Sequence, residues 1–291
     1  LLQVHLRLSD LFLSAFFYHV CLIAFQPCLH GFFTFDGNKG WSGGGISSHT
    51  SVSLHLDRSV FRNHTGGYGG GVSAYQLFGD HLLFENNSVV NTGGGISMSF
   101  GTLDNSRFIN NTSQNTTSPD AGGGAVFVNN TLTARNLLFD RNNALLGAAL
   151  YVKGGAVLKH ATIARPTRGT GRAIYIKSGA VLDVKNSILN AYEVAIYNDG
   201  TLTEDYNLAF DNGVDIISSG TVNLGGYSFV ANPLFAYPAG GNYRLRGASP
   251  AIGSGVNLGV TTDLDGKPRT ARWDIGAYQY FPSLFLPVVV K

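Results

Sequence analysis

The sequence is short of cysteine. Its 291 residues contain two, Cys21 and Cys28, and both precede the region in which the other patterns begin. Two cysteines cannot form the disulfide framework of a small secreted scaffold, and no spacing of Cys and His suggests a zinc site. The pair could close one disulfide loop in an exported protein or remain as reduced, buried thiols. The stability of this chain must therefore come from packing.

Charge and helical periodicity are also scarce. Only 13% of the residues are charged, the net charge is +2, and the Lys and Arg residues are scattered along the chain. A nucleic-acid-binding protein would gather its basic residues into a patch, so we expect no nucleic-acid partner. Apolar residues keep a spacing near 3.6 for no more than one turn, which argues against a helical fold. No nucleophile elbow, phosphate loop or metalloprotease motif occurs.

Apolar runs long enough to span a membrane are missing as well. The run at residues 11–25 has 15 residues, whereas a spanning helix needs about 20. Its length suits the core of an export signal, and equally a hydrophobic element that closes the first coil of a repeat fold. The apolar tail at residues 281–291 is shorter still, and it resembles either a sorting tail or a last strand. We expect no membrane span within the repeats.

What the sequence has in abundance is a repeat. Four glycine triplets start 24 to 29 residues apart, and each is followed by a small or aliphatic residue and then by a phenylalanine. A fixed period of this kind indicates a solenoid. The longest step contains an insertion of turn-forming residues between Asn110 and Gly122. The triplets are residues 43–45, 69–71, 93–95 and 122–124, and the phenylalanines are Phe61, Phe84, Phe108 and Phe139.

The pattern continues in weaker form. Gly147 and Gly171 take the place of the triplets, and Ile163 and Ile188 take the place of the phenylalanines. Within each period the stretches are short, alternating and rich in β-branched or aromatic residues, which is typical of strands. Three strands of about 4 to 6 residues with turns between them would form one coil. We predict an all-β fold, a right-handed parallel β-helix of about seven coils.

Equivalent residues of successive coils would stack about 4.8 Å apart in such a solenoid. Columns of Phe, Val, Ile and Leu would fill a narrow core, glycine would allow positive φ angles, and asparagine would occupy left-handed corners. The asparagine pairs at residues 86–87, 110–111 and 142–143 are therefore expected to form a ladder of side-chain amides along the stack.

The last third of the chain carries ordered motifs in place of repeats, at residues 186–189, 232–235, 242–245, 248–255, 262–269 and 274–278. Together they resemble the end of the choice-of-anchor Q family of bacterial surface proteins, which are pectate-lyase-like right-handed β-helices. The resemblance covers about residues 186–280. The repeats ahead of it are similar to those of polymorphic outer-membrane proteins. The resemblance implies export and surface display, but it implies no reaction.

Two positions depart from this family. Gly253 and Gln279 stand where the family usually has Asp and Glu, so two carboxylates are absent here. The C-terminal region is expected to act as a cap, because the last coil of a solenoid exposes an unpaired edge and an open core. We divide the chain into an apolar N-terminal segment at residues 1–40, repeats at 41–210, the cap at 211–280 and the tail at 281–291.

Aligning the repeats on their phenylalanines places ionisable residues at one position in successive coils. Asp57, Asp80 and Asp104 each lie four residues ahead of a phenylalanine, and Arg58 and His81 follow the first two. Carboxylates stacked about 5 Å apart repel one another, which raises their pKa values or recruits a cation. The separations between coils would also suit the paired carboxylates of glycosidases. The column is therefore a candidate ion-binding or glycan-binding site, with Arg107 as a neighbouring base.

A simpler interpretation of the same column is a solvated corner. Aspartate is an ordinary turn former, and the next coils carry Arg135 and Lys159 at this place. Asp263 and Asp265 resemble part of a calcium loop, but the further oxygen ligands and the closing Glu are missing, so a β-turn is the alternative. We assign no metal site and no resident cofactor, with calcium the one ion left open.

Two classes of function remain open on these grounds. The first is a secreted or surface-displayed bacterial β-helix that acts as an adhesive or structural module and contacts an extracellular polysaccharide or another cell-surface partner. The second is a polysaccharide lyase or glycoside hydrolase on the same scaffold, because a fold alone does not decide function. We expect a monomer in either case.

Overall fold

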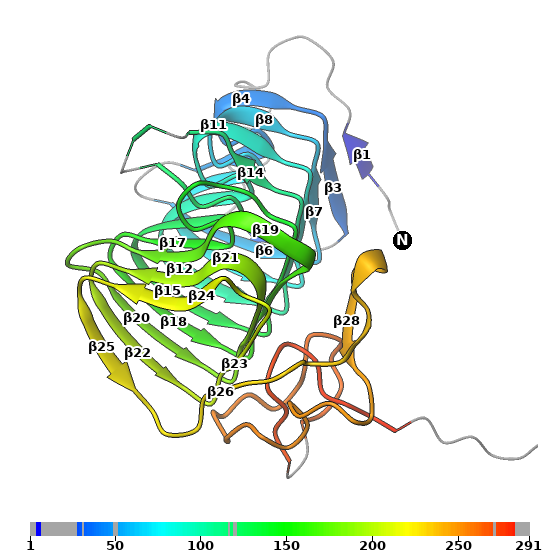
Figure 1. The fold of residues 1–291 in the computed structure, drawn as a ribbon. Helices are drawn as coiled ribbons and strands as arrows, with labels where there is room; N and C mark the ends of the chain where they lie inside the picture. The colour runs from blue at the N-terminus through cyan, green and yellow to red at the C-terminus, as the bar shows by residue number, and fades with distance from the viewer. Residues whose placement is uncertain are drawn as a thin grey trace, which may run out of the picture.

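A computed structural model describes residues 4–6, 28–30, 32–48, 52–115, 117–118, 121–269 and 272–282. Within them the chain winds into a parallel β-solenoid of about eight coils, stacked along one axis (Figure 1). The prediction of a right-handed parallel β-helix is confirmed. Among the described residues, no helix is both long and apolar enough to cross a membrane.

Little of the N-terminal segment belongs to the described residues. The apolar run at residues 11–25 lies outside them, as does the tail from residue 283 onward. Two short strands are described, β1 (Val4–Leu6) and β2 (Cys28–His30). They pair in parallel with β3 (Phe33–Asp36) and β6 (Ser53–Asp57) of the first coils.

One side of the solenoid, which we call the phenylalanine sheet, is built on the predicted aromatic column. Phe61, Phe84, Phe108 and Phe139 stack with ring centroids 4.9 to 5.1 Å apart, and Phe35 extends the stack at 4.8 Å. This spacing matches the distance between neighbouring strands. The strands of the sheet are β3, β7 (Val60–Arg62), β10 (Leu83–Glu85), β13 (Arg107–Ile109), β16 (Leu138–Asp140), the first parts of β19 (Thr162–Ile176) and β21 (Ile188–Asn198), β23 (Leu208–Phe210) and β26 (Phe229–Val230).

Beyond Phe139 the column continues with Ile163, as predicted, but then with Leu189. The prediction for Ile188 was wrong by one residue. The coil between these positions carries an irregular stretch in β19, with register shifts after Ala164, and is longer than its neighbours. Because successive residues of a strand face opposite sides, Ile188 points to the outer face of the sheet.

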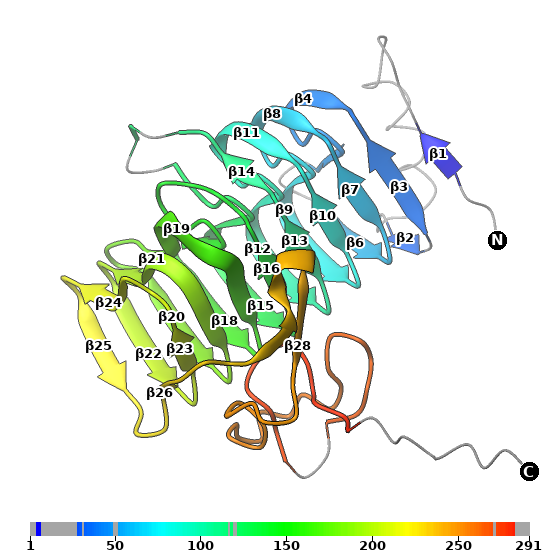
Figure 2. The ribbon, with the colours of Figure 1, turned by 45° about the vertical axis from the view of Figure 1, so that its right-hand side comes forward.

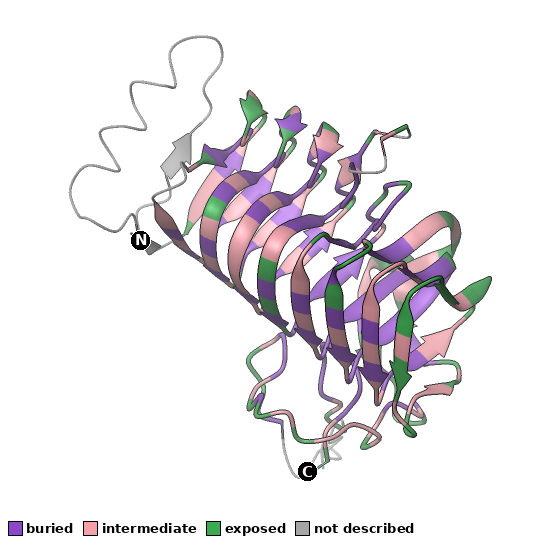
Figure 3. Cartoon of the chain, turned by 90° about the vertical axis from the view of Figure 1, so that its left-hand side faces the viewer, coloured by how far each residue is buried: buried purple, intermediate pink, exposed green. Residues whose placement is uncertain are grey.

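In each coil a longer sheet precedes the phenylalanine sheet. We call it the aspartate sheet, since its first strands end at Asp57, Asp80 and Asp104. Leu77 and Leu103 point inward and are fully buried, and inward and outward residues alternate along the strands (Figure 3). The strands of the sheet are β6, β18 (Gly155–Lys159), β20 (Val181–Lys185), β22 (Thr201–Asp205), β25 (Thr221–Leu224) and the second halves of β9 (Val72–Asp80), β12 (Ile96–Asp104) and β15 (Val126–Arg135).

The first halves of the same three long strands form a third side, which we call the trough sheet. A fourth, shorter sheet lies beside it in the early coils. The trough sheet also contains β5 (Ile46–Ser47), β17 (Leu150–Val152), β24 (Val214–Ser218) and the last parts of β19 and β21, and the short sheet contains β4 (Lys39–Ser42), β8 (Thr65–Tyr68), β11 (Ser88–Thr92) and β14 (Thr112–Ser113).

The glycine triplets form the corner between the short sheet and the trough sheet. A Cβ atom on Gly70 would lie 2.2 Å from the carbonyl oxygen of Gly94 on the next coil. Gly69 has a φ of 55°, in the left-handed region. The triplets are therefore required by the close approach of adjacent coils.

The predicted asparagine ladder is present on the corner that follows the phenylalanine sheet. Nδ2 of Asn87 donates to Oδ1 of Asn111 and to the carbonyl oxygen of Phe61, both at 2.9 Å. Asn111 repeats this pattern toward Asn142 at 3.0 Å and Phe84 at 2.9 Å. All three asparagines are fully buried. The ladder thus supplies hydrogen bonds where the backbone turns away from its own sheet.

Only one member of each predicted asparagine pair joins the ladder. Asn86 and Asn110 sit one position earlier, with φ angles of 56° and 54°, and supply the left-handed turn. In the next coil Arg141 takes that turn position, so Asn142 joins the ladder, and Asn143 instead forms a bridge with Thr112.

The C-terminal segment, which we define as residues 231–282, packs along the side of the solenoid (Figure 2). It contains β27 (Phe235–Tyr237), η1 (Pro238–Gly240) and β28 (Asn242–Leu245), and its two strands pair antiparallel. Its apolar side chains cover the outer face of the phenylalanine sheet around Leu138 and Ile188. The expected cap over the last coil is therefore wrong in its placement, because the outer face of this sheet is itself apolar.

Residues 211–230, which the sequence assigned to the cap, form one more coil. β24, β25 and β26 continue the trough, aspartate and phenylalanine sheets in register. The solenoid therefore extends beyond the predicted limits of residues 41 and 210, from Phe33 to Val230. This last coil was missed because it has no glycine triplet and follows a period shortened to 20 residues between Leu189 and Ala209, although Phe210 and Asn212 keep part of the pattern.

Candidate functional site

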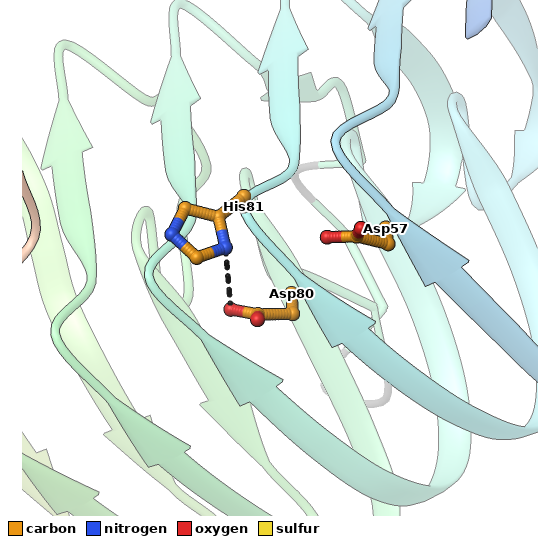
Figure 4. Close-up of side chains that lie close together, drawn as sticks. All are labelled: Asp57, Asp80 and His81. Carbon is orange, nitrogen blue, oxygen red and sulfur yellow. Dashed lines mark ion pairs between the residues drawn. The ribbon is translucent and has the colours of Figure 1, made fainter. Parts of the chain in front are cut away.

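The three aspartates lie in register at the end of the aspartate sheet. Asp57 pairs with Asp80, and Asp80 pairs with Asp104, on adjacent strands, so the predicted column is confirmed. One oxygen each of Asp57 and Asp80 and a ring nitrogen of His81 lie within 4.8 Å of one another (Figure 4). Arg58 and His81 form the corner itself, with φ angles of 49° and 52°.

Protein groups already engage the first two aspartates. Nδ1 of His81 lies 3.0 Å from Oδ1 of Asp80, and Nδ2 of Asn105 donates to the same oxygen at 2.9 Å. Nε of Arg58 lies 3.5 Å from Asp57. Repulsion between the stacked carboxylates is thus relieved by neighbouring side chains.

The other candidate residues are engaged elsewhere. Arg135 donates to both oxygens of Asp104 at 2.7 and 2.5 Å, and this hydrogen bonding raises the pKa of Arg135. Arg107 pairs at 2.9 Å with Asp265 of the C-terminal segment. Asp263 is buried and accepts two backbone hydrogen bonds within its own β-turn at 2.9 Å. Asp263 and Asp265 therefore shape and anchor a turn, as the alternative to a calcium loop predicted.

The chemistry open to the aspartate corner is limited. Asp57, Asp80 and His81 could together offer a cation two carboxylate oxygens and one imidazole nitrogen. The side chains of Asp80 and His81 are 48% and 40% exposed, so water competes strongly for any ion at this turn. Neither of the two hollows described below is lined by these residues.

A hollow of about 690 Å³ lies elsewhere, on the outer face of the trough sheet, and we call it the trough. Its floor is a column of Ser47, Ser73 and Ser97, which pair in register on β5, β9 and β12. Hydroxyl groups therefore recur about every 4.8 Å along the stack. Its lining comprises Ser42, Ser47, Ser48, Tyr68, Ser73, Ala74, Tyr75, Thr92, Ser97, Met98, Ser99, Phe127, Asn129 and Lys153. These described residues include one cation and no carboxylate.

Aromatic side chains flank the serine floor. Tyr68 and Tyr75 are each 38% exposed, and Trp41, which is 72% exposed, packs edge-on against Tyr68 at 5.9 Å. Toward the later coils Phe127 and Tyr151 replace the serines in the same column, with ring centroids 4.9 Å apart. The serine floor of the trough is thus flanked by Tyr68, Tyr75 and Trp41, and it is followed along the stack by Phe127 and Tyr151.

Sequence reasoning missed the trough, although a signal for it was present. Each of the first three triplets is followed by an aliphatic residue and then by serine, at Ser47, Ser73 and Ser97. Because the aliphatic residue faces inward, the serine that follows it must face outward. What the sequence could not show is that Tyr68 stands beside this column, because it belongs to β8 on another side of the coil.

Comparisons with family models, with curated proteins and with solved structures gave no match for this chain. Function is therefore inferred from the geometry of the two surfaces. The aspartate corner is an exposed turn whose charges are paired, whereas the trough is hollowed and lined by groups that can bind a polar ligand.

Proposed function

We propose that this protein is a surface-displayed β-helix that binds an extracellular polysaccharide along the trough without cleaving it. The observation that carries the proposal is the lining of the trough: a serine floor in coil register, exposed aromatic rims, one lysine and no carboxylate among the described residues. Export and display are inferred from the resemblance of residues 186–280 to the choice-of-anchor Q family.

The lining of the trough matches the chemistry of sugars. Polysaccharides present hydroxyl groups at the edges of their rings, and these can exchange hydrogen bonds with Ser73, Ser97 and the amide of Asn129. The rings also present apolar C–H faces, against which the flat sides of Tyr68 and Tyr75 can pack with little loss of side-chain entropy. Because paired strands already form the trough sheet, little free energy would be spent on ordering it when a ligand binds.

A lyase or hydrolase on this scaffold has less support. Such an enzyme needs carboxylates, with calcium or a base, directed at a bound sugar. The aspartates end the aspartate sheet, one corner away from the trough, and Arg107 is held by Asp265. Cleavage would therefore require a sugar bound at the exposed corner, outside the trough.

Retention of the purified protein on immobilised neutral and acidic polysaccharides tests this proposal. We expect binding to at least one polymer, with no release of reducing or unsaturated ends in the presence or absence of calcium. Tyr75→Ala and Ser73→Val should each weaken binding about tenfold, a change of about 1.4 kcal/mol. Tyr237→Ala is the control, because Tyr237 is also a surface tyrosine, 63% exposed against 38% for Tyr75, but lies in the C-terminal segment.

Two results would contradict the proposal. One is binding that Tyr75→Ala and Ser73→Val leave unchanged, which would remove the trough as the binding site. The other is the appearance of new sugar ends that Asp80→Ala abolishes, which would make the aspartate corner a catalytic site and the protein an enzyme.

A further inference from the structure

The far end of the solenoid is uncovered by the described residues. β24, β25 and β26 each pair with the preceding coil on one side only. The C-terminal segment lies beside the earlier coils and leaves this end open (Figures 1 and 2). Exposed residues gather on the last coil (Figure 3). The expectation of a monomer does not account for such an end, because an open stack exposes both an edge and its core.

Large apolar side chains are exposed at this end. Val214, Leu224 and Val230 are 46%, 66% and 69% exposed. Beside them an open hollow of about 170 Å³ reaches into the core between the sheets. It is lined mainly by apolar residues, namely Leu189, Ala195, Ile196, Ala209, Ile216, Phe229 and Val230, together with Glu204, Asn207, Asp215 and Ser228.

No strand of the described chain pairs with the outer edge of β25. The N–H groups of Thr221 and Gly225 donate back to the preceding coil, to Gly200 and Glu204. Because successive residues of a strand direct these groups to opposite sides, the N–H and C=O groups of Val222 and Leu224 face the open edge. Monomeric proteins usually block such edges with charged residues or proline. The sequence of β25 contains neither.

From this geometry we infer that a second copy of the same chain covers the last coil, with the two β25 strands paired antiparallel about a twofold axis. Such a pairing is self-complementary and brings no like charges together, because β25 is uncharged. The carboxylate of Asp215 on the neighbouring β24 is already engaged by the amide of Asn212 at 3.0 Å. The two open hollows would close against each other and bury the exposed apolar residues.

The opposite end of the solenoid is a poorer match for this end. There β1 and β2 already cover the outer edges of β3 and β6, which disfavours head-to-tail stacking. Residues 283–291 lie outside the described residues, and the test below treats them as the alternative cover.

Native mass spectrometry and sedimentation of the full chain test this inference. We expect a particle of twice the 31.0 kDa chain mass. The double variant Leu224→Lys/Val230→Lys should raise the dissociation constant at least tenfold, because it places charges on the paired faces. Val181→Lys is the matched control, since Val181 is 49% exposed on β20 in the middle of the stack, and it should leave the dimer intact.

Two variants of opposite charge at Asn223 distinguish a loss of strand pairing between chains from a loss of folding. Asn223→Glu and Asn223→Lys should each weaken the dimer, and mixing the two variants should restore it as a heterodimer. The inference is overturned by a monomeric wild-type chain, by a dimer that none of these variants weakens, or by open-ended filaments. It is equally overturned if dimers form only after removal of residues 283–291, because the tail would then be the native cover.

Discussion

At the scale of single residues, the corner after the phenylalanine sheet shows why asparagine recurs. The ladder position must offer an acceptor to the N–H group of the preceding coil and a donor to a backbone carbonyl, and one amide does both. In an early coil His64 takes this position, is fully buried, and accepts a hydrogen bond from the N–H of Asn38 through Nδ1 at 3.0 Å. Its Nε2 forms no hydrogen bond of normal geometry within the described part of the chain. Histidine is therefore a weaker member of the ladder.

Replacing Asn111, the central residue of the ladder, should show how much the stability of the fold depends on these amides. Asn111→Ala removes the acceptor of two Asn87 hydrogen bonds and the donor to Phe84, leaving buried polar groups unpaired. We expect a loss of about 3 kcal/mol in the free energy of unfolding, measured by urea denaturation. Asn257→Ala, at an exposed position of the C-terminal segment with one hydrogen bond, should change it by less than about 0.5 kcal/mol. Equal effects of the two variants would argue against the ladder.

Acid should destabilise the protein through His64. Burial lowers its pKa from 6.5 to about 4, so below pH 6.5 the unfolded chain binds a proton that the folded chain refuses. This contribution to stability is complete above pH 6.5 and is lost as the pH falls toward about 4, to an extent of about 3 kcal/mol. His64→Asn should flatten the stability profile in this window and leave the value at pH 7.5 nearly unchanged. Unfolding measured from pH 4 to 7.5 checks this, and parallel profiles would contradict it.

At the scale of elements, the C-terminal segment is attached through a few buried polar contacts as well as apolar packing. The hydroxyl of Tyr243 on β28 donates to Oδ1 of the buried Asp140 at the end of β16, at 2.6 Å. Burial raises the pKa of Asp140, so this hydrogen bond offsets part of the cost of its charge. Asn136 and Asn186, at left-handed corner positions, bond to the carbonyl oxygens of Thr262 and Val256. The corners thus serve as docking points.

Removing one hydroxyl should loosen this attachment. Tyr243→Phe leaves Asp140 with fewer donors in a buried site, at a cost of about 1 to 3 kcal/mol. We expect faster proteolytic cleavage within residues 231–282 while the solenoid stays protected. Tyr237→Phe, an exposed change in the same hairpin, is the control and should leave the cleavage rate unchanged. Cleavage of the solenoid at the same rate as the segment would contradict separate docking.

At the scale of the whole molecule, stability is carried from coil to coil. Each inner coil pairs with two neighbours, whereas the last coil pairs with one, so the protein behaves as a one-dimensional stack. The phenylalanine column ends at Phe139 and the continuous asparagine ladder ends at Asn142, and the amide of Asn212 recurs alone at this corner of the last coil. Stability should therefore decrease from the middle of the stack toward β25.

Hydrogen exchange measures this gradient directly. Backbone amides of β10, β13 and β16 should exchange slowest, and those of β24, β25 and β26 fastest, since opening of an end coil breaks one interface and not two. In the Leu224→Lys/Val230→Lys variant the difference in exchange rate between the middle and the end strands should widen, because the inferred second copy no longer covers the last coil. Uniform protection along the stack would contradict this picture.

Much of the fold was predictable because the repeat itself encodes it. Glycine triplets, phenylalanines and asparagines at one period predict coils, and identical positions then stack without further information. The aspartate column followed from the same alignment. Ile188 and the C-terminal limit of the solenoid were misjudged where the period lengthens after Ala164 and then shortens to 20 residues between Leu189 and Ala209.

The sequence by itself determined the coil, its period and the residues of its core, because these depend on contacts between equivalent positions. Only the tertiary structure decided which outer faces come together. The trough joins Tyr68, Ser73 and Lys153 from different sides and coils, and the C-terminal segment covers the phenylalanine sheet, leaving the last coil open. Such contacts join positions that no repeat relates, and they depend on how each corner directs the chain in space.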